Sequence, residues 1–185
     1  ALIYSTIDSV KLRIDDTLFA LKRDFTKEEV YTRVNLSTYA LLSNVHVTRK
    51  SLADNPLTGN GLGTHQLAYE MYLPQHMVSY NSYNQQDANS MALRLLSELG
   101  IIGFLLFCLF TISYKIRSRP SFSYQERVLW LINSGIFILI VLALLRNGNY
   151  TVHGKILFFL IYYYSYKQIR TFTHNDQLPN RGPSY

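Results

Sequence analysis

The second half of the chain contains two long runs without charged residues. The first, 99–114, continues the helical pattern of 92–98, so it predicts a membrane-spanning helix over 91–116. The second, 128–145, has an arginine at each end and predicts another span over 128–146.

A third apolar run, 156–166, has only eleven residues. This length alone suits a buried or re-entrant helix better than a full crossing. The run is rich in tyrosine, however, and lies between Lys155 and Lys167, which is typical of a helix anchored at both interfaces. We therefore expect a third span over 155–167.

The first 90 residues mix short apolar runs with charges and read as several short helices and loops. Segment 36–53 has one apolar face and should end at Asn55-Pro56, because the residue before a proline disfavours the helical region. Three alternating glycines follow at 59–63, and 65–73 predicts a short helix. The expected fold is therefore an all-α integral membrane protein, with a helical extracytoplasmic loop region at 1–90 before three spans.

The chain has a formal charge of +6, and the distribution of its basic residues indicates the membrane topology. Basic residues gather in the predicted loop 117–127 and in the tail 168–185, which places both on the cytoplasmic side. Segments 1–90 and 147–154 are then outside. Eight Lys and Arg against nine Asp and Glu in 1–90 leave no basic surface there, so we expect no nucleic-acid partner.

Several chemistries have no support in the sequence. Cys108 is the single cysteine, which excludes an intrachain disulfide. His65 and His76 lack a third aligned ligand, so we expect neither a metal nor another cofactor. The chain begins with Ala1 and shows no leader, although its first half must be exported; we interpret it as a fragment of a larger multi-span protein.

Three stretches in this order, NPLTGNGLGTH, DANSMALRLLSELGIIGF and LLRNGNY, resemble the C-terminal part of the O-antigen polymerase and O-antigen ligase superfamily. The resemblance covers about residues 35–165. It implies a multi-pass glycosyltransferase of the bacterial inner membrane that acts on oligosaccharides carried by polyprenyl pyrophosphate. Its partners would be that lipid-linked glycan, membrane lipid and a protein that regulates chain length.

The chain departs from the family pattern at one position. The family has a histidine before the Gly-x-x-Gly pattern, and the register set by Gly100 and Gly103 puts Asn89 there instead. An asparagine amide can form hydrogen bonds but cannot take a proton. Because the ligase branch is thought to use that histidine, the departure favours a polymerase. Arg146 and Tyr150 match further landmarks of the family.

The expected reaction releases a pyrophosphate, whose growing negative charge guanidinium groups can stabilise. Antiparallel packing of the first two spans would put Arg94 and Glu98 at the same depth as Arg146. Arg94 and Glu98 are also spaced i, i+4, so a simple intrahelical pair is the alternative. Arg146 could likewise be only an interface anchor.

The remaining candidate residues are those that could act as the catalytic base and those that could bind a phosphate group. Asp87, Glu98 and His65 are the outer groups that could accept a proton, with His65 or Asp87 preferred. The alternatives are a helix cap for Asp87 and a surface turn for His65. Free amides at Gly61 and Gly63 could hold phosphate, unless the segment is only a tight turn.

The sequence therefore predicts an O-antigen polymerase-like enzyme, in which Arg94 and Arg146 bind pyrophosphate and Asn89 orients the substrate. A ligase that transfers finished glycan is the closest alternative. A non-enzymatic transporter of lipid-linked glycan has only the mid-span Asn133 and Ser134 in its favour. An inactive remnant is the third alternative, and the isolated chain is expected to be inactive.

Overall fold

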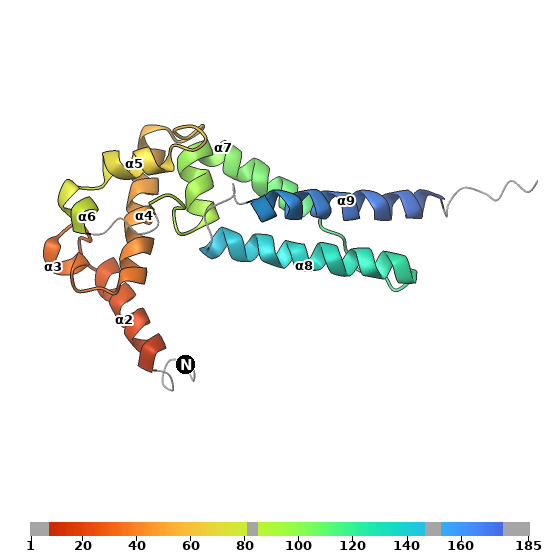
Figure 1. Cartoon of the computed structure of the whole chain (residues 1–185), viewed down its shortest axis with the longest axis horizontal. Coiled ribbons are helices and arrows are strands. Elements are labelled where there is room, and N and C mark those ends of the chain that lie inside the picture. Colours follow the sequence, from red (N-terminus) through yellow and green to blue (C-terminus); the bar gives the residue numbers. More distant parts are fainter. Residues whose placement is uncertain (1–7, 81–84, 147–152, 176–185) are drawn as a thin grey trace, which may run out of the picture. The chain divides into compact units, whose positions relative to one another are not determined.

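The computed structural model describes residues 8–80, 85–146 and 153–175, and this part of the chain contains eight helices and no strand (Figure 1). The contacts divide the chain into two compact units. The first contains 1–104 and 144–149, and the second contains 105–143 and 150–185. The prediction of an all-helical protein is confirmed.

The first unit contains five helices, the first part of a sixth and the last residues of α8 (Tyr124–Arg146). The first six are α2 (Asp8–Leu21), α3 (Glu28–Tyr31), α4 (Leu36–Asp54), α5 (His65–Tyr72), α6 (Gln75–Tyr80) and the beginning of α7 (Met91–Ser113). Asn35 starts α4, because its side chain accepts a hydrogen bond from the amide of Thr38. The helix ends at the residue before Asn55-Pro56, as the sequence predicts.

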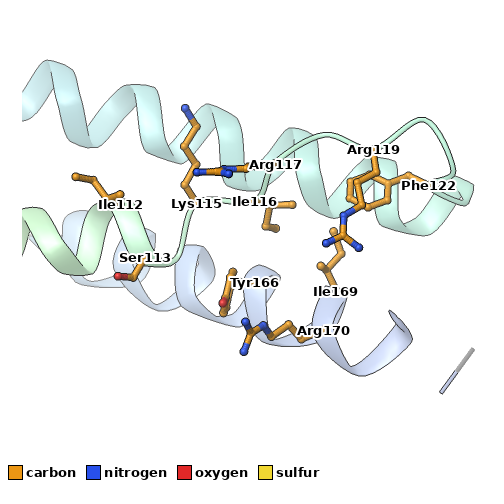
Figure 2. Close-up of a pocket in the computed structure, with 10 residues that line it drawn as sticks. All are labelled: Ile112, Ser113, Lys115, Ile116, Arg117, Arg119, Phe122, Tyr166, Ile169 and Arg170. Carbon is orange, nitrogen blue, oxygen red and sulfur yellow. The ribbon is translucent and has the colours of Figure 1, made fainter. Parts of the chain in front are cut away.

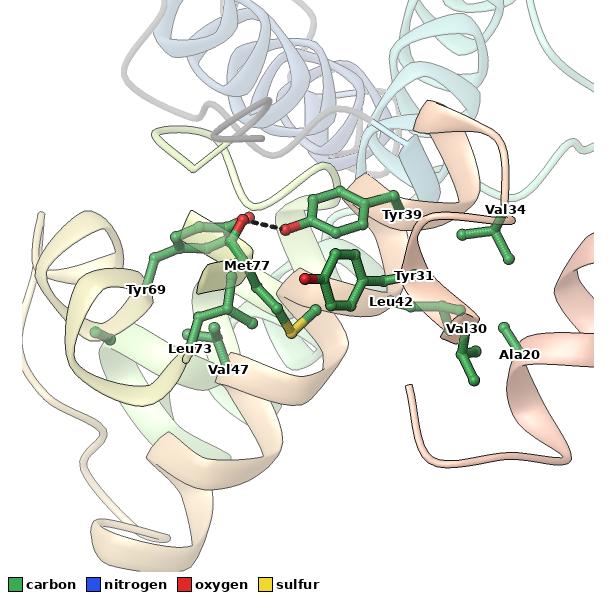
Figure 3. Packing of buried hydrophobic residues seen from close by; sticks show 11 residues of the cluster. Ala20, Val30, Tyr31, Val34, Tyr39, Leu42, Val47, Tyr69, Leu73 and Met77 are labelled. Atoms are coloured by element: carbon green, nitrogen blue, oxygen red, sulfur yellow. Dashed lines mark hydrogen bonds between the residues drawn. The ribbon is translucent and has the colours of Figure 1, made fainter. Parts of the chain in front are cut away.

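The core of the first unit is built around tyrosines (Figure 3). Tyr39 and Tyr69 are fully buried, and Val47 and Met77 pack with them. A buried tyrosine needs a partner for its hydroxyl group. Tyr39 finds one in the carbonyl of Met77, to which it donates at 2.6 Å, so α4 is tied to α6. Burial also raises the pKa of Tyr39 above the ordinary tyrosine value.

The second unit contains the end of α7, most of α8 (Tyr124–Arg146) and α9 (His153–Asn175), and Figure 1 shows α8 and α9 side by side. Asn133 of α8 is fully buried and links α8 to α9 and to the loop that follows α7. Its side-chain oxygen accepts from the amide of Ile116 at 2.9 Å. Its nitrogen lies 3.1 Å from the carbonyls of Tyr114 and Tyr162 and 3.3 Å from the hydroxyl of Ser165.

Two helices of the described chain, α7 and α8, are long and apolar enough to cross a membrane. Large apolar side chains stand out from both, among them Leu109 (60% exposed) and Leu131 (60% exposed). Such outward apolar faces suit a lipid environment. Helix α9 is longer than the predicted span at 155–167 but is not one of the two, so the third span stays a prediction.

Candidate functional site

The candidate site of the first unit lies where α7 is interrupted. Gly100 adopts φ 64° and ψ −165°, which no helix allows. An interruption leaves amides after it and carbonyls before it without helical partners. The chain between α4 and α5, residues 55–63, crosses the helix at this point and supplies the missing partners.

Both sides of the interruption are bonded to this crossing segment. After the break, the amide of Ile101 donates to the carbonyl of Pro56 at 2.9 Å, and that of Ile102 donates to Leu57 at 3.2 Å. Before the break, the carbonyl of Ser97 accepts from Asn60 at 3.0 Å, and that of Glu98 accepts from Gly61 at 2.8 Å. The glycine segment and the Gly-x-x-Gly segment are therefore two halves of one structure.

The carboxylate of Glu98 is fully buried beside the crossing and has three described donors. Arg94 donates to it through Nε at 2.9 Å. The backbone amides of Gly63 and His65 donate to it at 3.0 Å and 3.3 Å. These amides belong to the start of α5, where a negative charge is favourable. We call these four residues, with Ser97 and Asn44, the Glu98 cluster.

The structure shows Arg94 and Glu98 as the intrahelical pair that was the alternative interpretation of their spacing. They form the i, i+4 pair that the spacing allows, but the side chains are only 9% and 0% exposed. A surface pair contributes little to stability, whereas loss of one partner of a buried pair costs far more. Arg94 is therefore fixed in orientation by a carboxylate that other elements also hold.

The two amides that were expected to hold phosphate both donate to Glu98 here. Gly61 donates to its carbonyl and Gly63 to its carboxylate. Both glycines have positive φ, 104° and 80°, a conformation that glycine adopts without steric cost. Phosphate could use these amides only by displacing Glu98.

The imidazole of His65 is also buried, at 1% exposure, instead of lying on a surface turn. Its Nε2 lies 2.8 Å from Oδ1 of Asn44, and its Nδ1 lies 2.7 Å from the hydroxyl of Ser97. Burial, together with the nearby Arg94 guanidinium, lowers the pKa of His65 to about 4. The ring is therefore neutral and joins α4, α5 and α7.

Asp87 and Asn89 form the turn that leads into α7. A carboxylate oxygen of Asp87 accepts from the amide of Asn89 at 2.9 Å. Ala88 and Asn89 both have positive φ, 55° and 58°. Such conformations are costly for residues other than glycine and often mark functional sites. The hydroxyl of Ser90, and not Asp87, accepts from an amide of the first helical turn, that of Leu93.

Ser90 also connects the start of α7 with the end of α8. Its hydroxyl donates to the carbonyl of Leu144 at 2.6 Å. Both residues belong to the first unit, as does Arg146, which is exposed two positions further on. The contact holds the end of α8, which carries Arg146, at the start of α7, just after Asn89. Tyr150 lies outside the described residues.

Two members of the Glu98 cluster have no sequence signal. Asn44 lies in the middle of α4, where its side-chain nitrogen donates to Ala40 and its oxygen faces His65. Ser97 is an ordinary small residue of an apolar helix. Their role depends on contacts between positions more than 20 apart in the chain, which a local pattern does not contain.

The cluster can orient a cation and a carboxylate, but it offers no metal site. Throughout the three described stretches, no group of three His, Cys, Asp or Glu side chains could hold a metal ion.

Comparison of the chain with protein-family models, curated proteins and solved structures returns no match.

Proposed function

We propose that this chain is the C-terminal part of a membrane glycosyltransferase of O-antigen polymerase type. It would join oligosaccharide repeats carried on polyprenyl pyrophosphate into a surface polysaccharide. One observation carries the proposal: Arg94 is held in a buried cluster close to the start of the apolar helix α7, and Ser90 ties the end of α8, with Arg146, to that start.

In this proposal the two guanidinium groups stabilise the leaving group. An acceptor hydroxyl oxygen attacks the anomeric carbon of the donor glycan while the bond from that carbon to the pyrophosphate oxygen breaks. The electron pair leaves with the polyprenyl pyrophosphate, whose charge Arg146 and Arg94 bind. The proton of the attacking hydroxyl passes to a base.

Asp87 suits the role of base better than His65. Asp87 is half-buried in the turn before α7, beside Asn89, which would orient the substrate. His65 already has both ring nitrogens in hydrogen bonds inside the Glu98 cluster, so it would position Ser97 and Asn44. The base lies on the outer side if the basic loop 114–123 is cytoplasmic.

Two observations bear on the rival functions. Asn89 in place of a histidine favours a polymerase over a ligase, because the amide cannot take a proton. A transporter of lipid-linked glycan would need polar groups along its path. Asn133, the main polar residue within α8, instead has its side-chain oxygen bonded to the loop 114–123 and its nitrogen bonded to α9.

The test uses Arg146→Gln in the complete protein, with Arg127→Gln as the control that removes the same charge from the other end of α8. Arg94→Lys is the companion variant, because it keeps the charge beside Glu98 and avoids unfolding. We expect Arg146→Gln to shorten surface glycans to single repeats and Arg127→Gln to leave the ladder of chain lengths normal. A normal ladder in Arg146→Gln would refute the assignment.

Binding gives a second readout on the same variants. Purified protein in detergent is titrated with undecaprenyl pyrophosphate, and with uncharged undecaprenol as the control ligand. A lost charge-assisted hydrogen bond corresponds to a loss of affinity of roughly 10- to 100-fold. We expect that loss of affinity for the pyrophosphate and not for undecaprenol, in Arg146→Gln and not in the control Arg127→Gln. Equal affinity for both ligands would contradict a pyrophosphate site.

A further inference from the structure

The second unit contains a cavity of about 570 Å³ between the end of α7, the loop 114–123 and α9 (Figure 2). Its volume is within the range of small-molecule sites. Apart from Ser113, the residues around it are either basic or apolar and aromatic. The basic ones are Lys115, Arg117, Arg119 and Arg170.

Among the residues that the structure describes, no carboxylate balances these four cations. None of them has an ion-pair partner within the described residues, and no acidic side chain lines the cavity. Lys115 lies over the ring of Phe137, with its nitrogen 4.1 Å from the ring centre. Arg170 lies over the ring of Tyr166, at 5.1 Å. Cations that line one cavity repel one another unless an anion joins them.

The apolar residues form one continuous cluster beneath the cations. Ile116, Phe122 and Ile169 are buried together, and Trp130 and Tyr166 pack against them. Figure 2 shows Ile116 and Ile169 between Arg117 on the loop and Arg170 on α9. The cavity therefore offers a charged part and an apolar part, at the end of a helix whose apolar faces suit lipid.

We propose that this cavity binds an anionic phospholipid. The headgroup phosphate is held by Arg117, Arg119 and Arg170, and an acyl chain lies along the apolar cluster. Basic pockets between membrane helices bind acidic headgroups by this combination of charge and apolar contact. A free phosphate would match only the cations and would leave the apolar part of the site in contact with water. This proposal does not depend on the glycosyltransferase function.

Trp130 provides the measurement, because it is the single tryptophan of the chain and packs on the apolar cluster. The whole 185-residue chain is reconstituted in mixed micelles containing dibrominated phosphatidylglycerol or dibrominated phosphatidylcholine. The bromines quench Trp130 when the lipid is bound beside it. The ratio of quenching constants for the two lipids then reports the preference for a negative headgroup.

The variants are matched on one helix. Arg170→Gln removes a cation of the cavity, whereas Lys167→Gln removes an equally exposed cation of α9 that does not line it. We expect the native chain to prefer the anionic lipid at least about tenfold, and Arg170→Gln to lose about fivefold of this preference. Arg117→Gln should behave in the same way. Lys167→Gln and the charge-keeping Arg170→Lys should stay within about twofold of the native chain.

Three results would overturn the proposal. One is a native preference near unity, and another is an equal loss in Arg170→Gln and Lys167→Gln, which would mean a diffuse charge effect. The third concerns free phosphate. If sodium phosphate abolishes the preference while sodium chloride of equal ionic strength does not, the site binds inorganic phosphate and not a lipid.

Discussion

Gly59 lies directly against Gly100, where the segment 55–63 crosses the break in α7. A β-carbon on Gly59 would lie 2.6 Å from the backbone nitrogen of Gly100, and one on Gly100 would lie equally close to the nitrogen of Gly59. Both residues also have positive φ, 65° and 64°. Only glycine therefore satisfies the conformation and the space at both positions.

The first prediction is that Gly59→Ala and Gly100→Ala each destabilise the fold by about 3 kcal/mol or more. The positive φ accounts for roughly 1 to 2 kcal/mol, and the backbone clash adds a similar amount. The free energy of unfolding is measured in mild detergent by titration with a denaturing detergent.

Two other glycines separate these contributions. Gly63 has φ 80° with nothing within 4 Å, so Gly63→Ala should cost only about 1 to 2 kcal/mol. Gly135 lies inside α8 with open space around it, so Gly135→Ala should be neutral or stabilising by up to about 1 kcal/mol. A similar cost at all four positions would mean that the crossing is not tight.

The second prediction concerns the buried pair of Arg94 and Glu98. Glu98→Gln leaves a guanidinium buried without its carboxylate and should cost about 3 to 5 kcal/mol. The double variant Arg94→Met with Glu98→Gln removes both charges. Its loss of unfolding free energy should be smaller than the sum of the losses in the two single variants, by at least about 1.5 kcal/mol. Unfolding of all four proteins is measured in the same detergent.

The size of the coupling decides between two kinds of pair. An exposed i, i+4 pair would give only about 0.2 to 0.5 kcal/mol. A value in that range would show that solvent reaches the Glu98 cluster. The matched exposed cation is Lys167 of α9, and its substitution by Gln should change stability by less than about 0.5 kcal/mol.

The third prediction is a pH dependence from His65. Its pKa is about 4 in the folded chain against 6.5 for the ordinary residue. Below pH 6.5 the unfolded chain therefore binds a proton that the folded chain does not, so stability falls as the pH decreases towards 4. Between pH 7 and 5 the loss should be about 2 kcal/mol.

The variant His65→Gln isolates this contribution. It is less stable than the native chain at neutral pH, because the bonds to Asn44 and Ser97 change. It should lose about 2 kcal/mol less on acidification to pH 5, because the titrating group is absent. Other groups, such as His46, whose pKa is also lowered by burial, are common to both proteins. Parallel stability curves would contradict the prediction.

The local sequence pattern was enough to predict the helices but not their cross-connections. The uncharged runs gave α7 and α8, and Asn55-Pro56 gave the end of α4, because these features depend on neighbours in the chain. The i, i+4 spacing correctly allowed the bond between Arg94 and Glu98. These inferences use only the periodicity of a helix and the restrictions of proline.

The interruption at Gly100 and the use of Glu98 could not be derived in this way. A single glycine inside an apolar helical run is compatible with a continuous helix, and only the crossing segment shows why it is broken. The side chain of Glu98 accepts from amides 33 and 35 positions away, those of His65 and Gly63, and the Gly63 amide was expected to hold a phosphate. The sequence therefore singled out some members of the Glu98 cluster, but neither their bonds to one another nor the participation of Asn44 and Ser97.

The last prediction tests the role of Asn133 within the second unit. Asn133→Leu removes the partner of the Ile116 amide and of the carbonyls of Tyr114 and Tyr162. Hydrogen bonds between membrane helices contribute about 0.6 kcal/mol on average and up to about 1.7, so we expect a total loss of about 2 to 4 kcal/mol. Ser134→Ala, one position along and half-buried, should change stability by less than about 0.5 kcal/mol.

If Asn133 instead lined a path for a polar substrate, leucine would remove an unfavourable polar group and leave stability unchanged or higher. The direction of the change in unfolding free energy therefore separates a structural link from a transport path.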